Sequence, residues 1–410
     1  MTELTDTSLA VNGGQPLRTA PFPTWPIWDE SDVAAVTEAL RSSHWGIGGG
    51  AVATFQEELA AFHQARHAIC LANGTTALEV ALRAVGLEAG DEVIVPPYTF
   101  IATASACLMV NAVPVFVDIE PVSYNLDPAC IEPALTDRTR AIIAVHIAGC
   151  PADMDAINAI ARKHGLRVVE DAAQAVAAEW KGRRVGAIGD IGTLSFQSSK
   201  NLNCGEGGAC LTDQDDLADR CWSYSNVGRV REGAWYQHPL LGWNYRITQF
   251  QGALLSSQLK RVEEQANRRS ENAEYLSLLL AQIPGLSPPQ ADPRVTRHAW
   301  HLYVIRYHQE QWAGLPRAKF IEALNAEGIK CSPGYVPLYK EKAFRNPDVY
   351  GAAFRLASRP IDYDQVVCPV TEKACREEAV WLYQALLLGT RQDMEDIAGA
   401  IAKLRRVVPQ

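Results

Sequence analysis

Strand-like and helix-like segments alternate along the chain from about residue 55 onward, and this alternation limits the fold more than any other feature. Short apolar runs such as 92–95 and 141–146 have the length of buried strands, whereas 75–85 and 154–164 repeat apolar residues at helical spacing. Because alternating strands and helices form a parallel sheet covered by helices, we predict an α/β architecture. Ligands of such sheets bind beyond the carboxyl ends of the strands, so polar residues that follow a strand are candidate site residues.

The pattern changes after about residue 247. A long helix-like segment covers 247–268, and the rest contains one clear strand at 302–305 and helices at 317–327 and 391–405. A chain of 410 residues is long enough for two or three domains. We therefore predict a large domain at 1–272, which includes an N-terminal arm, and a smaller α+β domain at 273–410.

Composition excludes several kinds of partner. A net charge of −9 argues against binding to a nucleic-acid backbone. The N-terminus lacks the features of a secretory signal, and the longest apolar runs fall short of the ~18 residues that span a membrane. Ten cysteines are scattered without a Cys-x-x-Cys pair, which indicates free thiols rather than a metal site. We expect a cytoplasmic protein with no metal, no nucleic-acid partner and no membrane segment.

Two residues beyond strand ends could carry chemistry. Asp171 directly follows the predicted strand 166–170. A cofactor with a pyridine ring held beside its carboxylate would keep the ring nitrogen protonated. The alternative is that Asp171 only caps the following helix. Lys200 follows the strand 192–196 and could form a Schiff base with an aldehyde cofactor, or could be a surface lysine in a turn. Glycines at 205–208 indicate close approach of the backbone to a neighbour, which favours the chemical interpretation.

Three further segments fit a cofactor site. The turn Asn-Gly-Thr-Thr at 73–76 precedes a helix, whose free N–H groups and dipole favour a phosphate, although simple capping is the alternative. An aromatic residue in 96–100, after a strand, could stack on a planar ring or belong to the core. The segment 242–246 combines aromatic, amide and guanidinium groups, or forms a structural turn.

In their order along the chain, these motifs resemble the DegT/StrS-type aminotransferases, which use pyridoxal 5′-phosphate (PLP). The shared features are the phosphate-type turn, the aromatic residue, Asp-x-x-Gln at 171–174, Ser-x4-Lys-Asn with Gly-Glu-Gly-Gly at 195–208, and Asn-Tyr-Arg at 244–246. Similar stretches at 90–96, 116–119, 124–128 and 327–329 extend the resemblance over nearly the whole chain. The resemblance implies a fold type I PLP-transferase with a mostly parallel, seven-stranded-type sheet between helices, and an activity that aminates keto sugars or keto cyclitols.

The same resemblance implies roles for individual residues. Lys200 would hold the cofactor and then move a proton between substrate and cofactor, and Asp171 would pair with the pyridine nitrogen. Two half-reactions would follow in ping-pong order, with glutamine or glutamate as the amino donor. The other implied contacts are Gly74, Thr75 and Ser195 with the phosphate, Phe100 with the face of the ring, and Gln174 with the side of the ring hydroxyl.

A homodimer with shared active sites is also implied, because Asn244 would reach the phosphate of the cofactor in the neighbouring subunit.

Residues of the substrate pocket are harder to assign. Tyr335 and either His298 or His301 could line it, with a core or hinge role as the alternative. Arg246 could meet the carboxylate of the donor or form a structural ion pair.

The acceptor class rests on three short segments, at 23–26, 248–251 and 386–389. Thr-Gln-Phe-Gln at 248–251 resembles the branch that acts on cyclitols, whereas the branch acting on dTDP- or UDP-linked keto sugars more often has aspartate at the second position. We therefore predict a keto cyclitol such as scyllo-inosose first and a nucleotide-linked keto sugar second.

An alternative from another class is a PLP dehydratase that makes 3-amino-5-hydroxybenzoate. Lys200 argues against a sugar dehydratase with histidine at that position, and a non-catalytic PLP-binding regulator would need a DNA-binding module, which the sequence before residue 55 does not resemble.

Overall fold

Seven strands form the central sheet of the computed structural model, which describes residues 4–346, 351–357 and 360–408. Their order is β1-β9-β8-β5-β4-β2-β3, and only β9 runs against the other six. The predicted mostly parallel sheet is thereby confirmed. The strands are β1 (His67–Leu71), β2 (Glu92–Val95), β3 (Val113–Phe116), β4 (Thr139–Val145), β5 (Arg167–Asp171), β8 (Ile191–Ser195) and β9 (Gly208–Thr212).

Helices cover both faces of this sheet, so its strands are apolar on both sides. Successive side chains of a strand point to opposite faces. In β2, Val93 and Val95 pack on the side of α3 and α4, and Ile94 packs on the side of α2, α5 and α7. The helices are α2 (Gly50–His63), α3 (Gly74–Ala84), α4 (Ala102–Met109), α5 (Met154–His164), α6 (Asp215–Ser225) and α7 (Gln249–Leu280).

A second, antiparallel sheet forms in the C-terminal part of the chain, in the order β10-β12-β14-β13. The sequence predicted only the strand at 302–305, which is the centre of β12. The strands are β10 (Leu286–Ser287), β12 (Leu302–Tyr307), β13 (Cys331–Ser332) and β14 (Ala379–Tyr383), and the helices of this part are α8 (Arg317–Ala326), α9 (Gly351–Leu356), α10 (Pro369–Lys373) and α11 (Arg391–Val407). A small third sheet contains β6 (Glu179–Trp180), β7 (Arg183–Arg184) and β11 (Val295–Arg297).

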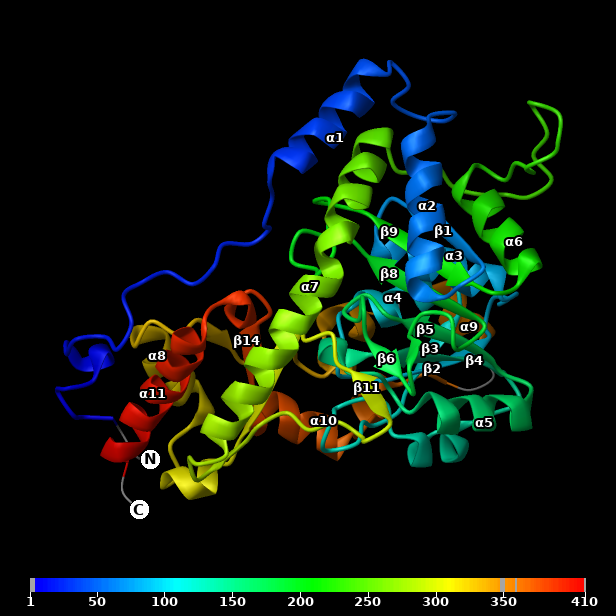
Figure 1. Ribbon diagram of the computed structural model, residues 1–410. Helices are drawn as coiled ribbons and strands as arrows, with labels where there is room; N and C mark the ends of the chain where they lie inside the picture. Colours follow the sequence, from blue (N-terminus) through cyan, green and yellow to red (C-terminus); the bar gives the residue numbers. More distant parts are fainter. Residues whose placement is uncertain (1–3, 347–350, 358–359, 409–410) are drawn as a thin grey trace.

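Helix α7 connects the two main sheets (Figure 1). Its first turns pack against α1 (Glu30–Arg41) and α2, and its later turns pack against α11 and the short helix η10 (Leu386–Leu388). The predicted domain boundary between residues 272 and 273 falls inside this helix. The division into domains therefore stays a prediction.

The N-terminal arm runs along the molecule from α8 and α11 to α1 (Figure 1). Arg18 fastens it to α11 by ion pairs with Asp393 and Asp396, at 2.7 and 2.5 Å. Farther along, the indole N–H of Trp25 donates to the carbonyl of Ser198, at 2.9 Å, so the arm reaches the loop that carries Lys200. None of the helices in the described ranges combines the length and apolar character that crossing a membrane requires.

Candidate active site

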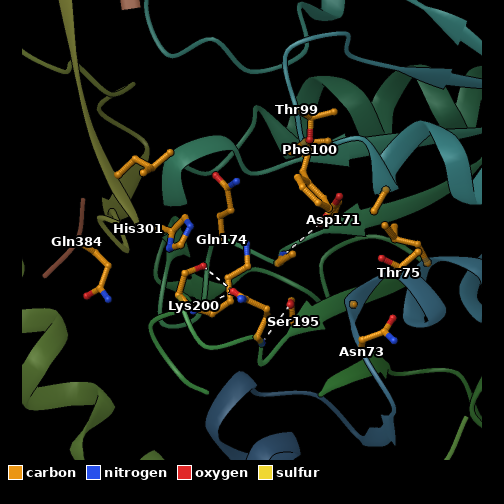
Figure 2. Close-up of a pocket in the computed structure, with 18 of the residues that line it drawn as sticks. Asn73, Thr75, Thr99, Phe100, Asp171, Gln174, Ser195, Lys200, His301 and Gln384 are labelled. Carbon is orange, nitrogen blue, oxygen red and sulfur yellow. Dashed lines mark hydrogen bonds between the residues drawn. The ribbon is translucent and has the colours of Figure 1, made fainter. Parts of the chain in front are cut away.

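A cavity of about 970 Å³ lies at the carboxyl ends of β4, β5 and β8 (Figure 2). The last residues of these three strands, Val145, Asp171 and Ser195, all line it. This is the place where a ligand is expected in an open α/β sheet. The predicted site residues that line this cavity are Gly74, Thr75, Phe100, Asp171, Gln174, Ser195, Lys200 and Tyr335.

Asp171 ends β5 as a buried carboxylate. Its Oδ2 accepts a hydrogen bond from the Thr103 hydroxyl at 2.7 Å, and its Oδ1 accepts one from the Ala173 N–H at 3.2 Å. The Thr103 hydroxyl also lies 2.9 Å from that of Thr99. Within the described ranges, no lysine, arginine or histidine forms an ion pair with Asp171. A buried carboxylate held only by neutral donors favours a cation beside it, such as a protonated pyridine nitrogen.

Lys200 lies in the loop between β8 and β9. Backbone hydrogen bonds close this loop, from the N–H of Phe196 to Gly207 O at 2.7 Å and from the N–H of Ser198 to Gly205 O at 3.0 Å. Burial lowers the pKa of Lys200 to about 8, although the charge of Asp171 acts in the opposite direction. A substantial fraction of the amine is therefore neutral near pH 8, as a nucleophile or general base requires.

The turn at 73–76 both caps a helix and leaves room for an anion. The Asn73 side chain accepts from the N–H of Thr76 at 2.9 Å, so the capping that the sequence left as an alternative does occur. The N–H groups of Gly74 and Thr75 lie just before that of Thr76 in the first turn of α3. Amides in the first turn of a helix have no intrahelical acceptor. A Cβ on Gly74 would lie 2.8 Å from the Cβ of Ser195. Only glycine fits there, and the free amides suit a phosphate.

Gln174 and Tyr335 fix each other at the cavity wall. The Gln174 Oε1 accepts from the N–H of Ala148 at 2.7 Å, and its Nε2 donates to the Tyr335 hydroxyl at 2.9 Å. The Tyr335 ring packs edge-on against Trp381, with centroids 4.5 Å apart. Burial raises the pKa of Tyr335, which keeps its phenol protonated. Because the phenol oxygen accepts from Gln174, its own proton can be donated into the cavity.

Phe100 is 56% exposed at the edge of the cavity. Figure 2 shows it above Asp171, on the side of the pocket that also holds Thr75. A free aromatic face at this place suits stacking on a planar ring. The stacking itself stays a prediction.

Three predicted residues lie outside the lining of this cavity. His298 stacks on Trp300 with centroids 3.9 Å apart, and His301 from the same segment lines the cavity in its place. Arg246 donates to the Asn226 side chain at 2.8 Å, and Asn244 pairs with the backbone of the same residue. The contact of Asn244 with the cofactor of a neighbouring subunit and that of Arg246 with the donor carboxylate stay predictions.

Sequence reasoning missed several residues of the site. Thr103 could have been found from its position, because it lies one helical turn after Thr99 in the segment that follows strand β2. In the sequence, Trp25 belongs only to a segment typical of one branch of the resembling family, and no motif includes Gln384. Both line the cavity. They come from opposite ends of the chain, so no local pattern could have joined them to Lys200.

Comparison with known proteins identifies the family. The sequence model of the DegT/DnrJ/EryC1/StrS aminotransferase family matches residues 26–387. The chain belongs to this family. It is a PLP-dependent aminotransferase of fold type I, as the motifs predicted.

Individual relatives match nearly the whole aminotransferase. It is 41% identical over 415 residues to the "Putative L-glutamine:3-amino-2,3-dideoxy-scyllo-inosose aminotransferase" of Streptoalloteichus tenebrarius, with 98% of each chain covered. It is 38% identical over 417 residues to the L-glutamine:2-deoxy-scyllo-inosose aminotransferase of the same organism, with 97% of each chain covered. The crystal structure of 3-amino-5-hydroxybenzoic acid synthase matches with a TM-score of 0.85 and 33% identity, over 94% of this chain and 99% of that one.

The cavity of the aminotransferase fits PLP. Gly74 and the open amides of α3 suit the phosphate, and a Cβ at that position would fill the space. Asp171 is a buried carboxylate without a cationic partner in the described chain, and Lys200 is a buried amine with a lowered pKa. These are the three groups that PLP needs: an anion site, a partner for the ring nitrogen and a nucleophilic amine.

Proposed function

We propose that the aminotransferase moves the amino group of L-glutamine to the ketone of a cyclitol of the scyllo-inosose class. The names of the two relatives described above support both the donor and the acceptor. One observation in the cavity carries the choice of acceptor. Among the described residues that line it, Lys200 is the only lysine or arginine. A nucleotide-linked sugar brings a pyrophosphate that favours cationic partners, whereas a cyclitol is neutral.

The side chains of the site would divide the work as follows. When bound, PLP supplies an electron sink that stabilises negative charge on the carbon from which a proton is removed. The Gly74 and Thr75 amides and the Ser195 hydroxyl would hold the phosphate, and Asp171 would keep a positive charge at the ring nitrogen. In the donor half-reaction the Lys200 amine would take the proton from the α-carbon of the donor and pass it to the cofactor, and in the acceptor half-reaction it would move a proton in the reverse direction, to the acceptor carbon.

Polar and aromatic groups at the other side of the cavity would orient the substrates. Tyr335, Tyr383 and His301 line it there, and the Trp25 indole adds an apolar wall. Hydroxyl groups of a cyclitol can donate to and accept from such groups. Donor and acceptor would occupy the same cavity in turn, which requires ping-pong kinetics.

A half-reaction assay tests the proposal. The PLP form is mixed with L-glutamine, and loss of its visible absorbance reports the donor half. After removal of the donor, 2-deoxy-scyllo-inosose and a dTDP-linked keto sugar are supplied separately, and the return of the absorbance and the mass of the product report the acceptor half. We expect the inosose alone to restore the signal and to yield an aminocyclitol. Restoration by the nucleotide sugar alone would contradict the proposed acceptor.

A second candidate function is a dehydratase reaction like that of 3-amino-5-hydroxybenzoic acid synthase, because that structure matches over 94% of this chain. Its product is aromatic, so ultraviolet absorbance distinguishes it from an aminocyclitol. The substrates in this assay are the aminated, unsaturated ring acids from which such a product forms by loss of water. An increase of aromatic absorbance with them, without any amine transfer, would favour this function.

We also propose that the enzyme is a cytoplasmic homodimer in which Asn244 completes the neighbouring site. Two observations support the dimer. Asn244 does not line the cavity of its own chain, and the nearby segment 229–241 exposes large apolar side chains, with Trp235 80% and Leu241 96% exposed. Such exposed apolar groups mark contact surfaces. The ten cysteines are free thiols, which suits a reducing compartment.

The dimer is tested with Asn244→Ala. We expect this variant to remain dimeric in sedimentation velocity and to lose PLP more readily during dialysis than the wild-type enzyme. A monomeric wild-type enzyme that retains full activity would contradict the shared site.

A further inference from the structure

A buried arginine without a carboxylate partner lies behind the wall of the cavity. Arg269 on α7 has an exposed fraction of 0%, and no aspartate or glutamate of the described chain forms an ion pair with it. Its Nε and Nη2 both donate to the Gln384 Oε1, at 2.9 and 2.6 Å. Its Nη1 has no hydrogen-bond partner among the described residues. The guanidinium also lies 5.2 Å from the centre of the Trp25 ring.

Both neighbours of Arg269 are cavity residues, since Gln384 and Trp25 line it. Figure 2 shows Gln384 and His301 on the side of the pocket opposite to Asn73 and Thr75, with Lys200 between the two sides. The charge of Arg269 therefore lies behind the end of the cavity that is far from the phosphate turn, where a substrate would lie.

Gln384 is held firmly in this position. It directly follows β14, and the segment after it is fastened to α7 by the Asn272 side chain, which donates to Leu387 O and Gly389 O at 2.8 and 2.9 Å. Arg268 adds a further bond to Gly389 O at 3.1 Å. Because the Gln384 amide oxygen accepts both N–H groups of Arg269, its amide NH₂ is left to donate elsewhere. A guanidinium bound to the oxygen also polarises the amide and strengthens these N–H donors.

The positive charge at this end of the cavity is not balanced by the surrounding residues. Burial lowers the pKa of Arg269, but an arginine stays protonated at neutral pH. Burial, together with the charges of Lys200 and Arg269, lowers the pKa of His301, so that this ring is neutral. The carboxylates on the cavity wall are Asp171, on the side of the ring nitrogen, and Glu206. An uncompensated buried cation is costly, and a bound anion would offset that cost.

We propose that the amide of Gln384 binds the α-carboxylate of the amino donor, with the positive charge of Arg269 lying directly behind this amide. The inference rests on the proposed function in one respect, that the donor is an amino acid. Gln384 would touch the carboxylate through its amide NH₂, and Arg269 would act as a positioning residue that fixes the amide and supplies the positive potential. The cyclitol carries no negative charge, so this pair distinguishes the two substrates that share one cavity. It also offers a binding site for the donor carboxylate within the same chain, in contrast to Arg246, which lies outside the cavity lining.

The test is the variant Gln384→Glu in the holoenzyme. The new carboxylate can still accept both N–H groups of Arg269, so the fold is preserved, but it has no N–H to donate and cancels the positive charge. We expect kcat/KM of the donor half-reaction with L-glutamine to fall about 10- to 100-fold, mainly through KM, because a hydrogen bond to a charged group is lost. The acceptor half-reaction, started from the pyridoxamine form, should change less than about threefold.

A binding measurement supplies a readout that needs no turnover. The ligand 4-carbamoylbutanoate has the carboxylate and amide of glutamine but lacks its amino group, and butanamide lacks the carboxylate as well. Calorimetry should show that Gln384→Glu weakens binding of 4-carbamoylbutanoate about 10- to 100-fold and leaves that of butanamide unchanged. Equal effects on both ligands, or on both half-reactions, would overturn the inference.

A matched pair of variants tests the role of Arg269. Arg269→Met removes the buried charge, and Arg268→Met removes the neighbouring arginine that binds Gly389 O instead of Gln384. Thermal melting verifies that both variants fold. Arg269→Met should reproduce the selective loss in the donor half, and Arg268→Met should not. If the wild-type enzyme accepts no amino acid donor, the proposed function fails and the donor part of the inference fails with it, and the binding measurement then tests only whether Gln384 binds a carboxylate. If L-glutamine is accepted but Gln384→Glu changes neither the donor half-reaction nor the binding of 4-carbamoylbutanoate, the inference alone fails.

Discussion

The two sides of the cavity are built differently. The cofactor side consists of groups on rigid elements at one edge of the sheet: the first turn of α3 and the ends of β5 and β8. The substrate side consists of side chains from four separate segments, namely Trp25, His301, Tyr335 and Gln384. Charge and backbone dominate the first side, and hydrogen bonds between side chains dominate the second. Changes on the cofactor side should therefore disable both half-reactions, whereas changes on the substrate side should alter one substrate at a time.

The largest expected effect is that of Lys200→Ala. Loss of the amine removes both the nucleophile and the proton carrier, so both half-reactions should slow by at least about 1000-fold. Single-turnover absorbance measures each half separately. Lys163→Ala is the control, because this exposed lysine only pairs with Glu132 on the surface. A variant of Lys200 that slowed just one half would break the contrast between the two sides.

Gly74→Ala should act on the cofactor itself. The new Cβ would lie 2.8 Å from the Ser195 Cβ and would push the phosphate turn away from β8. We expect the dissociation constant of PLP to rise about 10- to 100-fold, as measured by fluorescence titration of the apoenzyme. Gly50→Ala is a matched control, since this glycine also begins a helix but has open space around its Cβ position. Equal PLP affinity in the two variants would contradict the close fit at Gly74.

The lowered pKa of Lys200 predicts how the apoenzyme reacts with PLP as pH changes. Only the neutral amine attacks the aldehyde, and its fraction falls as pH drops below a pKa of about 8. The rate of cofactor uptake should therefore decrease roughly fivefold from pH 8 to pH 7 and level off above pH 9. Stopped-flow absorbance measures this rate. A rate that keeps rising to pH 10 would indicate an ordinary, solvated lysine.

Among the substitutions, the smallest effect is expected for Tyr335→Phe on the substrate side. The change removes the hydroxyl that accepts from Gln174 at 2.9 Å but preserves the ring packing on Trp381. We expect KM for one substrate to rise about threefold to tenfold, with PLP affinity changed less. Tyr303→Phe is a control that removes another buried hydroxyl, which bonds to Ser277 away from the cavity. A loss of PLP from Tyr335→Phe as large as that from Gly74→Ala would remove the distinction between the two sides.

The same contrast explains which parts could be predicted from the sequence. The seven strands of the large sheet were predictable because each contains a short apolar run of strand length. Helix α5 matched its predicted bounds because Asp153 caps its start and Gly165 ends it in a left-handed conformation. Helix α1 and strand β14 were not predicted, since each is stabilised mainly by packing on distant elements, α7 and β12 respectively.

The site follows the same rule. Asp171, Lys200 and Gly74 belong to motifs of a few residues at strand ends, so their positions could be predicted locally. Thr103 and Gln384 act through contacts with Asp171 and Arg269, which are 68 and 115 residues away in the chain. No sequence pattern within one chain indicates such pairs. The bound partners of Asn244 and the stacking of Phe100 stay predictions.

Helix α7 has a further consequence for how this enzyme could acquire other substrates. Near its start, Gln251 donates to the carbonyl of Glu206 in the loop of Lys200, and farther along Arg269 holds Gln384. The 18 helical steps from Gln251 to Arg269 span about 27 Å of continuous helix. Inserting one residue would rotate one contact by about 100° relative to the other. Along α7, new specificity is therefore expected from exchanges of side chains rather than from insertions, because an insertion between these contacts would shift the Lys200 loop relative to the substrate wall.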